Sequence, residues 1–302
     1  MGRRKHGADI HGIVLLDKPA GITSNRALQK VRGIFQARKA GHTGSLDPFA
    51  TGMLPICLGE ASKTAAFMLE AGKRYRATAH LGVATSTGDL EGEVIQTCPI
   101  PDIHPGTLMQ ILQRFTGEIE QVPPMYSALK HEGRPLYEYA RAGIVIERPA
   151  RTVTIHQLEL VDWQSPGLTF DVHCSKGTYI RTLAEDIAAA LDCCAHLVAL
   201  RRMLVEPFDD YPMWTLEQLQ EARERGDLLD SLLAVDAGLV AWPRVDVDTE
   251  QQLKFRHGQQ ILLAEGRSVT GNTRVYGPED NLLGLAKVAS NGNLQPSRVF
   301  NM

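Results

Sequence analysis

The sequence predicts an α+β fold with a mixed, largely antiparallel sheet flanked by helices, followed by a small β-barrel-like module. Stretches with strand and helix periodicity alternate along the chain without a regular strand–helix–strand cadence. The glycine patterns of Rossmann and P-loop nucleotide sites are absent from the sequence. The length of 302 residues favours two domains over one.

The first elements are a helix over 23–35 and a strand over 73–83. Thr23 and the two residues after it are good helix caps, and apolar side chains recur at helical spacing as far as Phe35. Residues 73–83 alternate with period two and place Tyr75 on the apolar face, which predicts a half-buried strand.

Residues 168–191 change periodicity midway. An alternating strand runs to Cys174, "SKG" makes a turn, and a helical pattern begins at Ile180. Further helices are expected at 106–115 and 215–235. The apolar window at 187–200 is short and carries an aspartate, so it predicts a buried segment and no membrane span.

A domain boundary is expected around 242–250, which divides the chain into a catalytic domain, 1–244, and a C-terminal module, 245–302. The acidic helix at 215–235 would be the connector. Beyond it, a helix at 249–256 is followed by short strand-like runs that "GPEDN" and "SNGN" separate, a pattern typical of a small β-barrel.

Composition indicates an ordinary globular protein in a reduced, cytoplasmic setting. Hydrophobic residues make up 43% of the chain and charged residues 22%. The five cysteines form no CxxC pair, and the adjacent Cys193 and Cys194 suit neither a bridge nor a zinc knuckle. No apolar signal core follows the basic N-terminus.

Charge is distributed unevenly. Residues 1–76 hold 13 Lys/Arg against 5 Asp/Glu, although the whole chain has a net charge of −3. Residues 206–250 hold 12 acids against 3 bases. Either a polyanion docks on the basic end or these charges only solvate helix faces, and charge alone leaves both open. The exposed cations expected to meet a polyanion are Arg26, Lys30, Arg32, Arg38 and Lys39.

The stretch "GHTGSLDPFATG" at 41–52 holds a single carboxylate, Asp47, in a loop rich in glycine. Gly41, Gly44 and Gly52 permit backbone conformations that other residues resist. Pro48 restricts Asp47 toward an extended conformation. By itself this pattern fits an aspartate that caps a turn as well as one that does chemistry.

Six blocks together resemble one family. They are "LDKPAGITSN" (16–25), the 41–63 block with the Asp47 loop, "KRYRATAHLG" (73–82), "VPPMYSALKHEGRPLYEYARAG" (122–143), "KGTYIRTL" (176–183) and "LRR" (200–202). In this order they resemble the TruB family of tRNA pseudouridine synthases, and 245–302 more loosely resembles the PUA RNA-binding module.

The resemblance implies an enzyme that isomerises uridine 55 in the T-loop of tRNA to pseudouridine. It implies no cofactor, no metal, no membrane and no obligate protein partner, in a monomer that acts on the tRNA T-arm. The catalytic residue would be Asp47, which acts either on the sugar C1′ or as a base.

Further site residues are implied by their match to family positions. Arg181 would keep Asp47 ionised. Tyr75 would stack on the flipped base, Tyr179 and Leu200 would line the pocket, and His42 would contact the RNA loop. Read without the family, each is an ordinary surface or core residue. The candidate phosphate contacts in the matching blocks are Lys18, Lys130, Arg141 and Arg202.

Two other functions stay open from the residues. One is a guide-RNA-dependent pseudouridine synthase, whose relatives carry longer basic termini. The other is an RNA-binding protein without chemistry, which the set of Asp47, Tyr75 and Arg181 disfavours.

Overall fold

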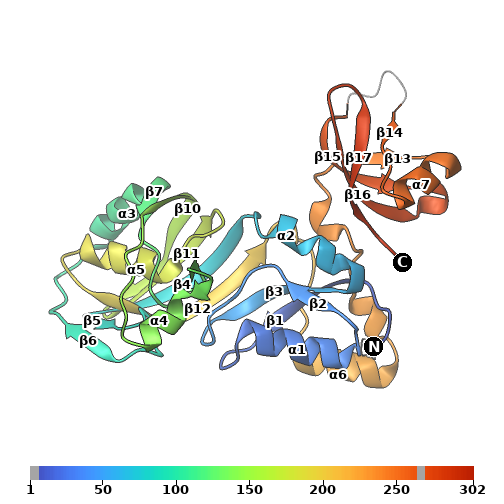
Figure 1. Cartoon of the computed structure of the whole chain (residues 1–302). Coiled ribbons are helices and arrows are strands. Elements are labelled where there is room, and N and C mark those ends of the chain that lie inside the picture. The colour runs from blue at the N-terminus through green and yellow to red at the C-terminus, as the bar shows by residue number, and fades with distance from the viewer. Residues whose placement is uncertain (1–6, 264–268) are drawn as a thin grey trace.

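The chain forms a large mixed sheet with helices against it and a separate C-terminal sheet (Figure 1). This computed structural model describes residues 7–263 and 269–302; the basic residues 3–5 lie outside that part. The predicted α+β class is confirmed.

The large sheet has eight strands in the order β1-β3-β12-β4-β11-β10-β7, with β2 paired to β3. All neighbours are antiparallel except β3 and β12, where Arg202 lies opposite Gly52. The strands are β1 (Gly12–Lys18), β2 (Ala40–His42), β3 (Thr51–Leu58), β4 (Lys73–Leu81), β7 (Gly117–Gln121), β10 (Arg151–Gln164), β11 (Gly167–Cys174) and β12 (Ala195–Val205).

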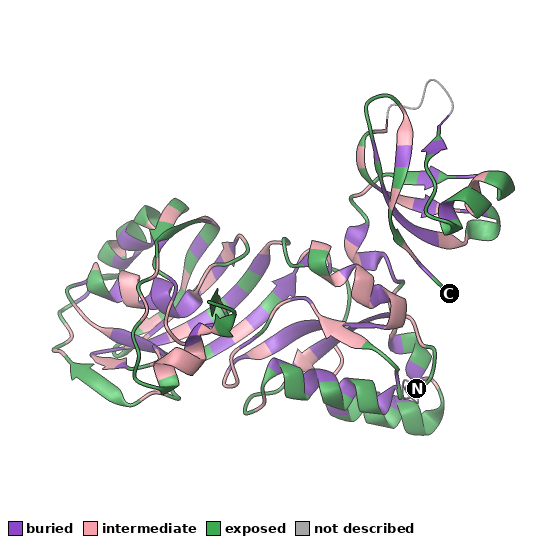
Figure 2. Cartoon of the chain, viewed as in Figure 1, coloured by how far each residue is buried: buried purple, intermediate pink, exposed green. Residues whose placement is uncertain are grey.

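Helices cover the two ends of this sheet separately. Helices α1 (Ser24–Ile34) and α6 (Leu216–Arg225) pack on β1 and β3, while α3 (Pro105–Arg114) and α5 (Ile180–Ala189) pack on the half that contains β4 and β10–β12 (Figure 1). Figure 2 shows the outer faces of α1 and α6 exposed. The helices expected at 23–35 and 106–115 and the strands expected at 73–83 and 168–174 are confirmed within two residues.

The connector helix expected over 215–235 is shorter than predicted. Thr215 and Gln218 form a capping box at the start of α6, and Gly226 ends the helix in the left-handed conformation. A 3-10 turn, Leu228–Ser231, follows instead of continued α-helix. The acidic composition of 215–235 did not reveal this stop, although Gly226 is a typical C-terminal signal.

Small elements surround the large sheet. Two hairpins, β5 (Val83–Thr85) with β6 (Val94–Thr97) and β8 (Lys130–His131) with β9 (Arg134–Pro135), extend from it. The short helices α2 (Ala65–Met68) and α4 (Leu136–Arg141) complete this part. No helix among residues 7–263 and 269–302 is long and apolar enough to cross a membrane.

The C-terminal sheet has the order β13-β15-β16-β17-β14 and carries helix α7. One hydrophobic cluster, which includes Phe255 and Val275, lies wholly within this module. Its elements are β13 (Arg244–Asp246), α7 (Thr249–Arg256), β14 (Ile261–Leu262), β15 (Gly271–Tyr276), β16 (Leu282–Val288) and β17 (Asn293–Val299).

This sheet is fastened to the rest of the chain. Leu285 and Phe300 lie in one buried cluster with Ile13 and Met68. The Asn301 backbone N–H donates to Glu60 at 2.9 Å, and nearby Lys63 Nζ donates to the Val299 carbonyl at 2.7 Å. Arg274 and the half-buried Tyr276 both bond Asp236, at 2.9 and 2.5 Å. The module therefore depends on the large domain for part of its packing.

We expect Phe300→Ala to lower the free energy of unfolding by about 3 kcal/mol, because it empties part of this shared cluster. Phe300 is only 5% exposed. Met302→Ala, at a side chain that is 51% exposed, is the matched control and should change stability by less than about 0.5 kcal/mol. Denaturant unfolding measures both, and equal effects would contradict a shared core.

Candidate active site

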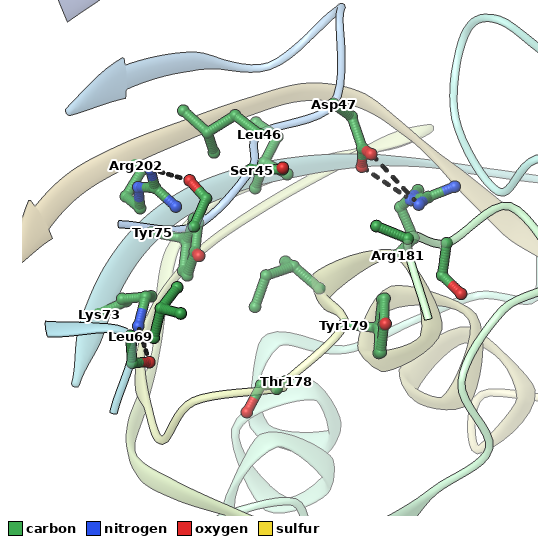
Figure 3. Close-up of a pocket in the computed structure, with 16 residues that line it drawn as sticks. Ser45, Leu46, Asp47, Leu69, Lys73, Tyr75, Thr178, Tyr179, Arg181 and Arg202 are labelled. Carbon is green, nitrogen blue, oxygen red and sulfur yellow. Dashed lines mark hydrogen bonds and ion pairs between the residues drawn. The ribbon is translucent and has the colours of Figure 1, made fainter. Parts of the chain in front are cut away.

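A cavity of about 300 Å³ opens where β4, β12, the start of α5 and the Asp47 loop meet. Figure 3 shows Asp47 and Arg181 on one side of it and Tyr75, Arg202 and Lys73 on the other. Apolar groups such as Leu46 and Leu200 line the space between. Four of the six predicted site residues therefore meet Asp47 in one cavity, namely Tyr75, Tyr179, Arg181 and Leu200.

The Asp47 loop is held by bonds to both neighbours of the aspartate. The buried Ser24 hydroxyl accepts from the Leu46 N–H at 2.7 Å and donates to the Leu46 carbonyl at 3.0 Å. The Pro48 carbonyl accepts from Lys18 Nζ at 3.2 Å and from the Gly21 N–H at 2.9 Å. Asp47 is thus fixed in orientation by side chains from the 16–25 block as well as by its own glycines.

Two of the three loop glycines have the conformation that was expected. Gly44 has φ +118° and Gly52 has φ +100°. A Cβ on Gly52 would lie 2.2 Å from the Arg202 carbonyl oxygen, so this glycine lets β3 approach β12. Gly41 is different: it lies in strand β2, where it pairs with Cys57 of β3, and it has no positive φ.

Asp47 is paired with Arg181. The Arg181 Nε lies 3.1 Å from Asp47 Oδ2, and its Nη2 lies 3.4 Å from Oδ1. The arginine side chain is only 6% exposed, whereas Asp47 is 37% exposed toward the cavity. The helical pattern leaves Arg181 off the apolar stripe of its helix, which by itself predicts a surface arginine. In the fold this side chain is buried, so the prediction of a surface position is wrong.

Arg181 has further partners that the sequence reasoning missed. Its Nη1 donates to the Thr87 carbonyl at 2.7 Å and lies 3.4 Å from Asp89 Oδ2. Nη2 donates to the Tyr126 carbonyl at 2.8 Å. Asp89 is 2% exposed and also accepts from the Thr87 hydroxyl at 2.5 Å. In the sequence, the turn-rich stretch "TSTGDLEG" at 85–92 contains Asp89 and could have indicated this second carboxylate.

Opposing influences act on the Asp47 carboxyl. Burial raises its pKa above the ordinary 3.8; Arg181 lowers it, Asp89 raises it and Lys18 lowers it. The net direction is upward. Without Arg181, the same burial would favour the neutral acid still more strongly.

Tyr75 forms the opposite wall with Arg202. Figure 3 places Tyr75 beside Arg202. Burial raises the phenol pKa above 10, and the nearby Arg202 opposes this rise. Arg202 also donates to the Met53 carbonyl at 2.7 Å and to the Gly44 carbonyl at 3.2 Å. Burial lowers the pKa of Lys73, on the same wall, to about 8. Three cations, Lys73, Arg181 and Arg202, thus share the cavity with one carboxylate.

Tyr179 and Leu200 complete the cavity. Tyr179 precedes helix α5, and Gln121 bonds both its N–H, at 3.1 Å, and its carbonyl, at 3.3 Å. Leu200 lies on β12 and is 7% exposed. Both residues sit at element ends or on the sheet, which gives the cavity rigid walls.

His42 lies in an adjoining hollow of about 460 Å³ that shares Asp47 and Arg181 with the first. Its Nδ1 accepts from the Gly44 N–H at 3.3 Å, and burial lowers its pKa below 6.5. Tyr137 and Arg141 line the same hollow. His42 is therefore near the carboxylate but does not line the first cavity.

The four candidate phosphate contacts divide into two pairs. Lys18 and Arg202 are 0% and 1% exposed and bond backbone carbonyls, so the expectation that they meet phosphates is wrong. Lys130 and Arg141 are exposed. The Lys18 and Arg202 side chains hold backbone segments together through their carbonyl groups. The sequence motifs did not indicate this role.

The site offers protein groups and no ligand set for a metal. Across the described part of the chain, no group of three His, Cys, Asp or Glu side chains is arranged to hold a metal ion. One carboxylate beside a permanent cation can act as a nucleophile or a base on a bound molecule. The apolar walls with a few polar groups suit a planar base.

Solved structures show the class of fold. The chain aligns with a TM-score of 0.74 and 26% identity to "Crystal Structure of a Cbf5-Nop10-Gar1 Complex", covering 96% of this chain and 85% of that one. It aligns equally well, at 23% identity, to "Structure of H/ACA RNP bound to a substrate RNA containing 2'-deoxyuridine", covering 100% and 92%.

Family matches cover nearly the whole chain. Residues 32–180 match the TruB family pseudouridylate synthase N-terminal domain, 181–239 the tRNA pseudouridylate synthase B C-terminal domain, and 243–300 the Pseudouridine synthase II TruB C-terminal domain.

Curated relatives match at full length. A protein named tRNA pseudouridine synthase B from Mannheimia succiniciproducens is 48% identical over 99% of both chains, and one from Vibrio cholerae is 47% identical over 99% of this chain and 98% of its own. The chain belongs to the TruB family of pseudouridylate synthases, which are isomerases.

Proposed function

We propose that this chain converts uridine 55 in the T-loop of tRNA to pseudouridine, with Asp47 as the catalytic residue. The observation that carries the proposal is that the Asp47 carboxylate lies 3.1 Å from a buried guanidinium at the wall of a base-sized cavity. The relatives named tRNA pseudouridine synthase B support tRNA as the substrate.

The reaction balances without a cofactor or metal. The bond from N1 to the ribose C1′ breaks, the base turns, and C5 bonds to C1′. The C5 proton leaves and N1 gains one, so no electrons are transferred. Asp47 either adds to C1′ or removes a proton from the sugar, and both roles need the ionised carboxylate that Arg181 favours.

The uridine has to leave its stack to reach Asp47. Unstacking costs a few kcal/mol, which pocket contacts offset. In this proposal the base lies against Tyr75 and between Tyr179 and Leu200. His42 contacts the RNA loop from the adjoining hollow.

In this proposal, fewer cations contact RNA than the excess of lysine and arginine in residues 1–76 indicates. Lys30 lines a groove with Glu217 and Glu221 of α6, which offset its charge. Arg38 donates to the Gly7 carbonyl at 2.8 Å and lies 3.6 Å from Asp9. We therefore place the tRNA contact at the rim of the site, near two exposed cations. Arg141 of α4 lines the hollow that contains His42, and Arg26 of α1 follows directly after the lining residue Asn25.

Reversing Arg26 and Arg141 to Glu should weaken tRNA binding and reduce the slope of log K against log salt by about two, because each phosphate contact releases counterions. The matched control reverses two exposed acids away from the site, Glu224 and Asp230, to Lys. Filter binding at several salt concentrations measures the slopes. Equal changes in both double variants would place the tRNA on another surface.

The pH profile of kcat/KM should report the raised pKa of Asp47. Activity should fall on the acid side with an apparent pKa above 3.8, since burial favours the protonated, inactive carboxyl. Asp89→Asn should move this limb to lower pH, because Asp89 raises the pKa. Steady-state rates across pH measure both, and a limb in Asp89→Asn at equal or higher pH would contradict the electrostatic account.

We also propose that 1–244 is the catalytic domain and that 245–302 adds RNA contacts remote from the chemistry. All six site residues precede 244, which supports the division. Because the module shares a core with the large domain, its role is better tested by surface substitutions in the full chain than by truncation.

An unmodified tRNA transcript tests the proposed function. The purified chain alone, with a chelator, should form one pseudouridine per tRNA at position 55, located by chemical derivatisation and primer extension. A need for a guide RNA or a partner protein would favour the guide-dependent class instead. Binding without any pseudouridine would favour an RNA-binding protein without chemistry.

A further inference from the structure

Three of the five cysteines gather at one place outside the active site. Cys98 follows hairpin strand β6, and Cys193 and Cys194 lie in the loop between α5 and β12. The Cys98 Sγ lies 2.6 Å from Cys194 Sγ and 3.5 Å from Cys193 Sγ. The sequence showed only the adjacent pair, which cannot easily bridge to itself; the fold supplies the distant partner.

The backbone holds the two segments in place without any sulfur bond. The Cys98 N–H donates to the Gly82 carbonyl at 2.9 Å, and the Gly82 N–H donates to the Cys194 carbonyl at 2.8 Å. The Cys194 N–H also points at the Cys98 sulfur, at 2.9 Å. Cys98 and Cys194 are therefore prearranged as partners.

All three thiols of this cluster are partly exposed, whereas Cys57 and Cys174 are 0% and 1% exposed. We propose that Cys98, Cys193 and Cys194 form an oxidation site, at which hydrogen peroxide converts Cys98 and Cys194 to a disulfide. None of the three lines either cavity at Asp47.

The chemistry balances with peroxide as the oxidant. The Cys98 thiolate attacks one peroxide oxygen, the O–O bond breaks, and Cys98 becomes a sulfenic acid as hydroxide leaves and takes a proton. The Cys194 sulfur then attacks the Cys98 sulfur and displaces the hydroxyl as water, while its own proton goes to solvent. In total two thiols and one peroxide give one disulfide and two waters.

Electrostatics assign the attacking role to Cys98. Hydrogen bonds from the Cys194 thiol above all, and also from the Cys193 thiol and the Cys194 N–H, lower the pKa of Cys98 below 9. Burial raises the pKa of Cys194 to about 11. A thiolate with a lowered pKa beside a resolving thiol is the arrangement that peroxide-sensitive cysteines use.

The disulfide would join the two segments that hold Arg181. The β5–β6 hairpin carries Thr87 and Asp89, and the other segment continues from α5, which begins with Ile180 and Arg181. Oxidation would thus fasten the end of the hairpin to the segment that follows α5. The expected result is a more rigid hairpin.

Peroxide treatment of the reduced full-length chain tests the proposal. Intact mass should fall by about 2 Da for the two hydrogens removed, and dithiothreitol should reverse it. Peptide mapping should find Cys98 joined to Cys194, with Cys57 and Cys174 still alkylatable. Hydrogen exchange across 83–98 should slow, and Tm should rise by about 5 °C because the bond closes a long loop.

Serine variants separate this site from general oxidation. Cys98→Ser should slow thiol loss at least about ten-fold, since the low-pKa thiolate is gone. Cys193→Ser should leave the rate within about two-fold. Melting of the reduced variants checks that each is folded. Equal oxidation of all five cysteines, sulfinic acid at Cys98 with no disulfide, or no effect of Cys98→Ser would overturn the proposal.

Discussion

Asp47→Asn should abolish pseudouridine formation, with a loss of about four orders of magnitude or more, while tRNA binding changes by less than about three-fold. The amide keeps the shape of the side chain but cannot act as nucleophile or base. Release of tritium from tRNA labelled at uridine C5 measures turnover, and filter retention measures binding.

The variant should also remain folded. Because burial raises the pKa of Asp47 in the folded chain, its ionised form opposes folding at pH 7, and the neutral amide should leave Tm unchanged or higher. Asp171→Asn is the matched control, since Asp171 forms an exposed pair with Arg76 on the same sheet. Substantial turnover by a folded Asp47→Asn would falsify the assignment of this residue.

Arg181→Met should lower kcat by about 100-fold and tRNA binding far less, because the loss falls on the charge balance around Asp47. It should also shift the acid limb of the pH profile to higher pH, since Arg181 lowers the pKa of Asp47. Stability should fall by a few kcal/mol, because the buried Asp89 loses its cation. Single-turnover rates, binding and thermal melting separate the three effects.

Arg181→Lys should recover only part of the rate. A lysine restores the charge but cannot bond Asp47, Thr87 and Tyr126 together as the planar guanidinium does. Arg76→Met, which breaks the exposed Asp171 pair, is the matched control and should leave the rate unchanged. If the Met variant turned over as fast as the unaltered chain, the pairing of Arg181 with Asp47 would be irrelevant to catalysis.

Local patterns predicted the five longer helices, α1, α3, α5, α6 and α7, and two strands of the large sheet, β4 and β11, because periodicity and caps act over a few residues. The helix at α1 begins after Thr23, whose side chain accepts from the Arg26 N–H as expected of a cap. The boundary of α6 was missed although Gly226 marks it. Strand order, in contrast, depends on long-range pairing such as that of β3 with β12, which no local pattern encodes.

In the candidate site, too, local motifs identified single residues, whereas the contacts between them depend on the fold. Motifs brought Asp47, Tyr75 and Arg181 to attention one at a time, but only the fold shows that Arg181 is buried and in contact with Asp47. The sequence did not predict a role for Asp89, because its partner, Arg181, lies 92 positions away in the chain. Lys18 and Arg202 are candidate phosphate contacts by their place in the matching blocks, but both are buried and bond backbone carbonyls. Lysine and arginine are rarely fully buried, so the sequence did not indicate this.

A co-structure of Asp47→Asn with a T-arm RNA hairpin tests the central claim most directly. We expect uridine 55 to lie outside its stack, with its base against Tyr75 and between Tyr179 and Leu200, and its ribose facing residue 47. A uridine that stays stacked in the loop, or a different nucleotide in the cavity, would contradict it.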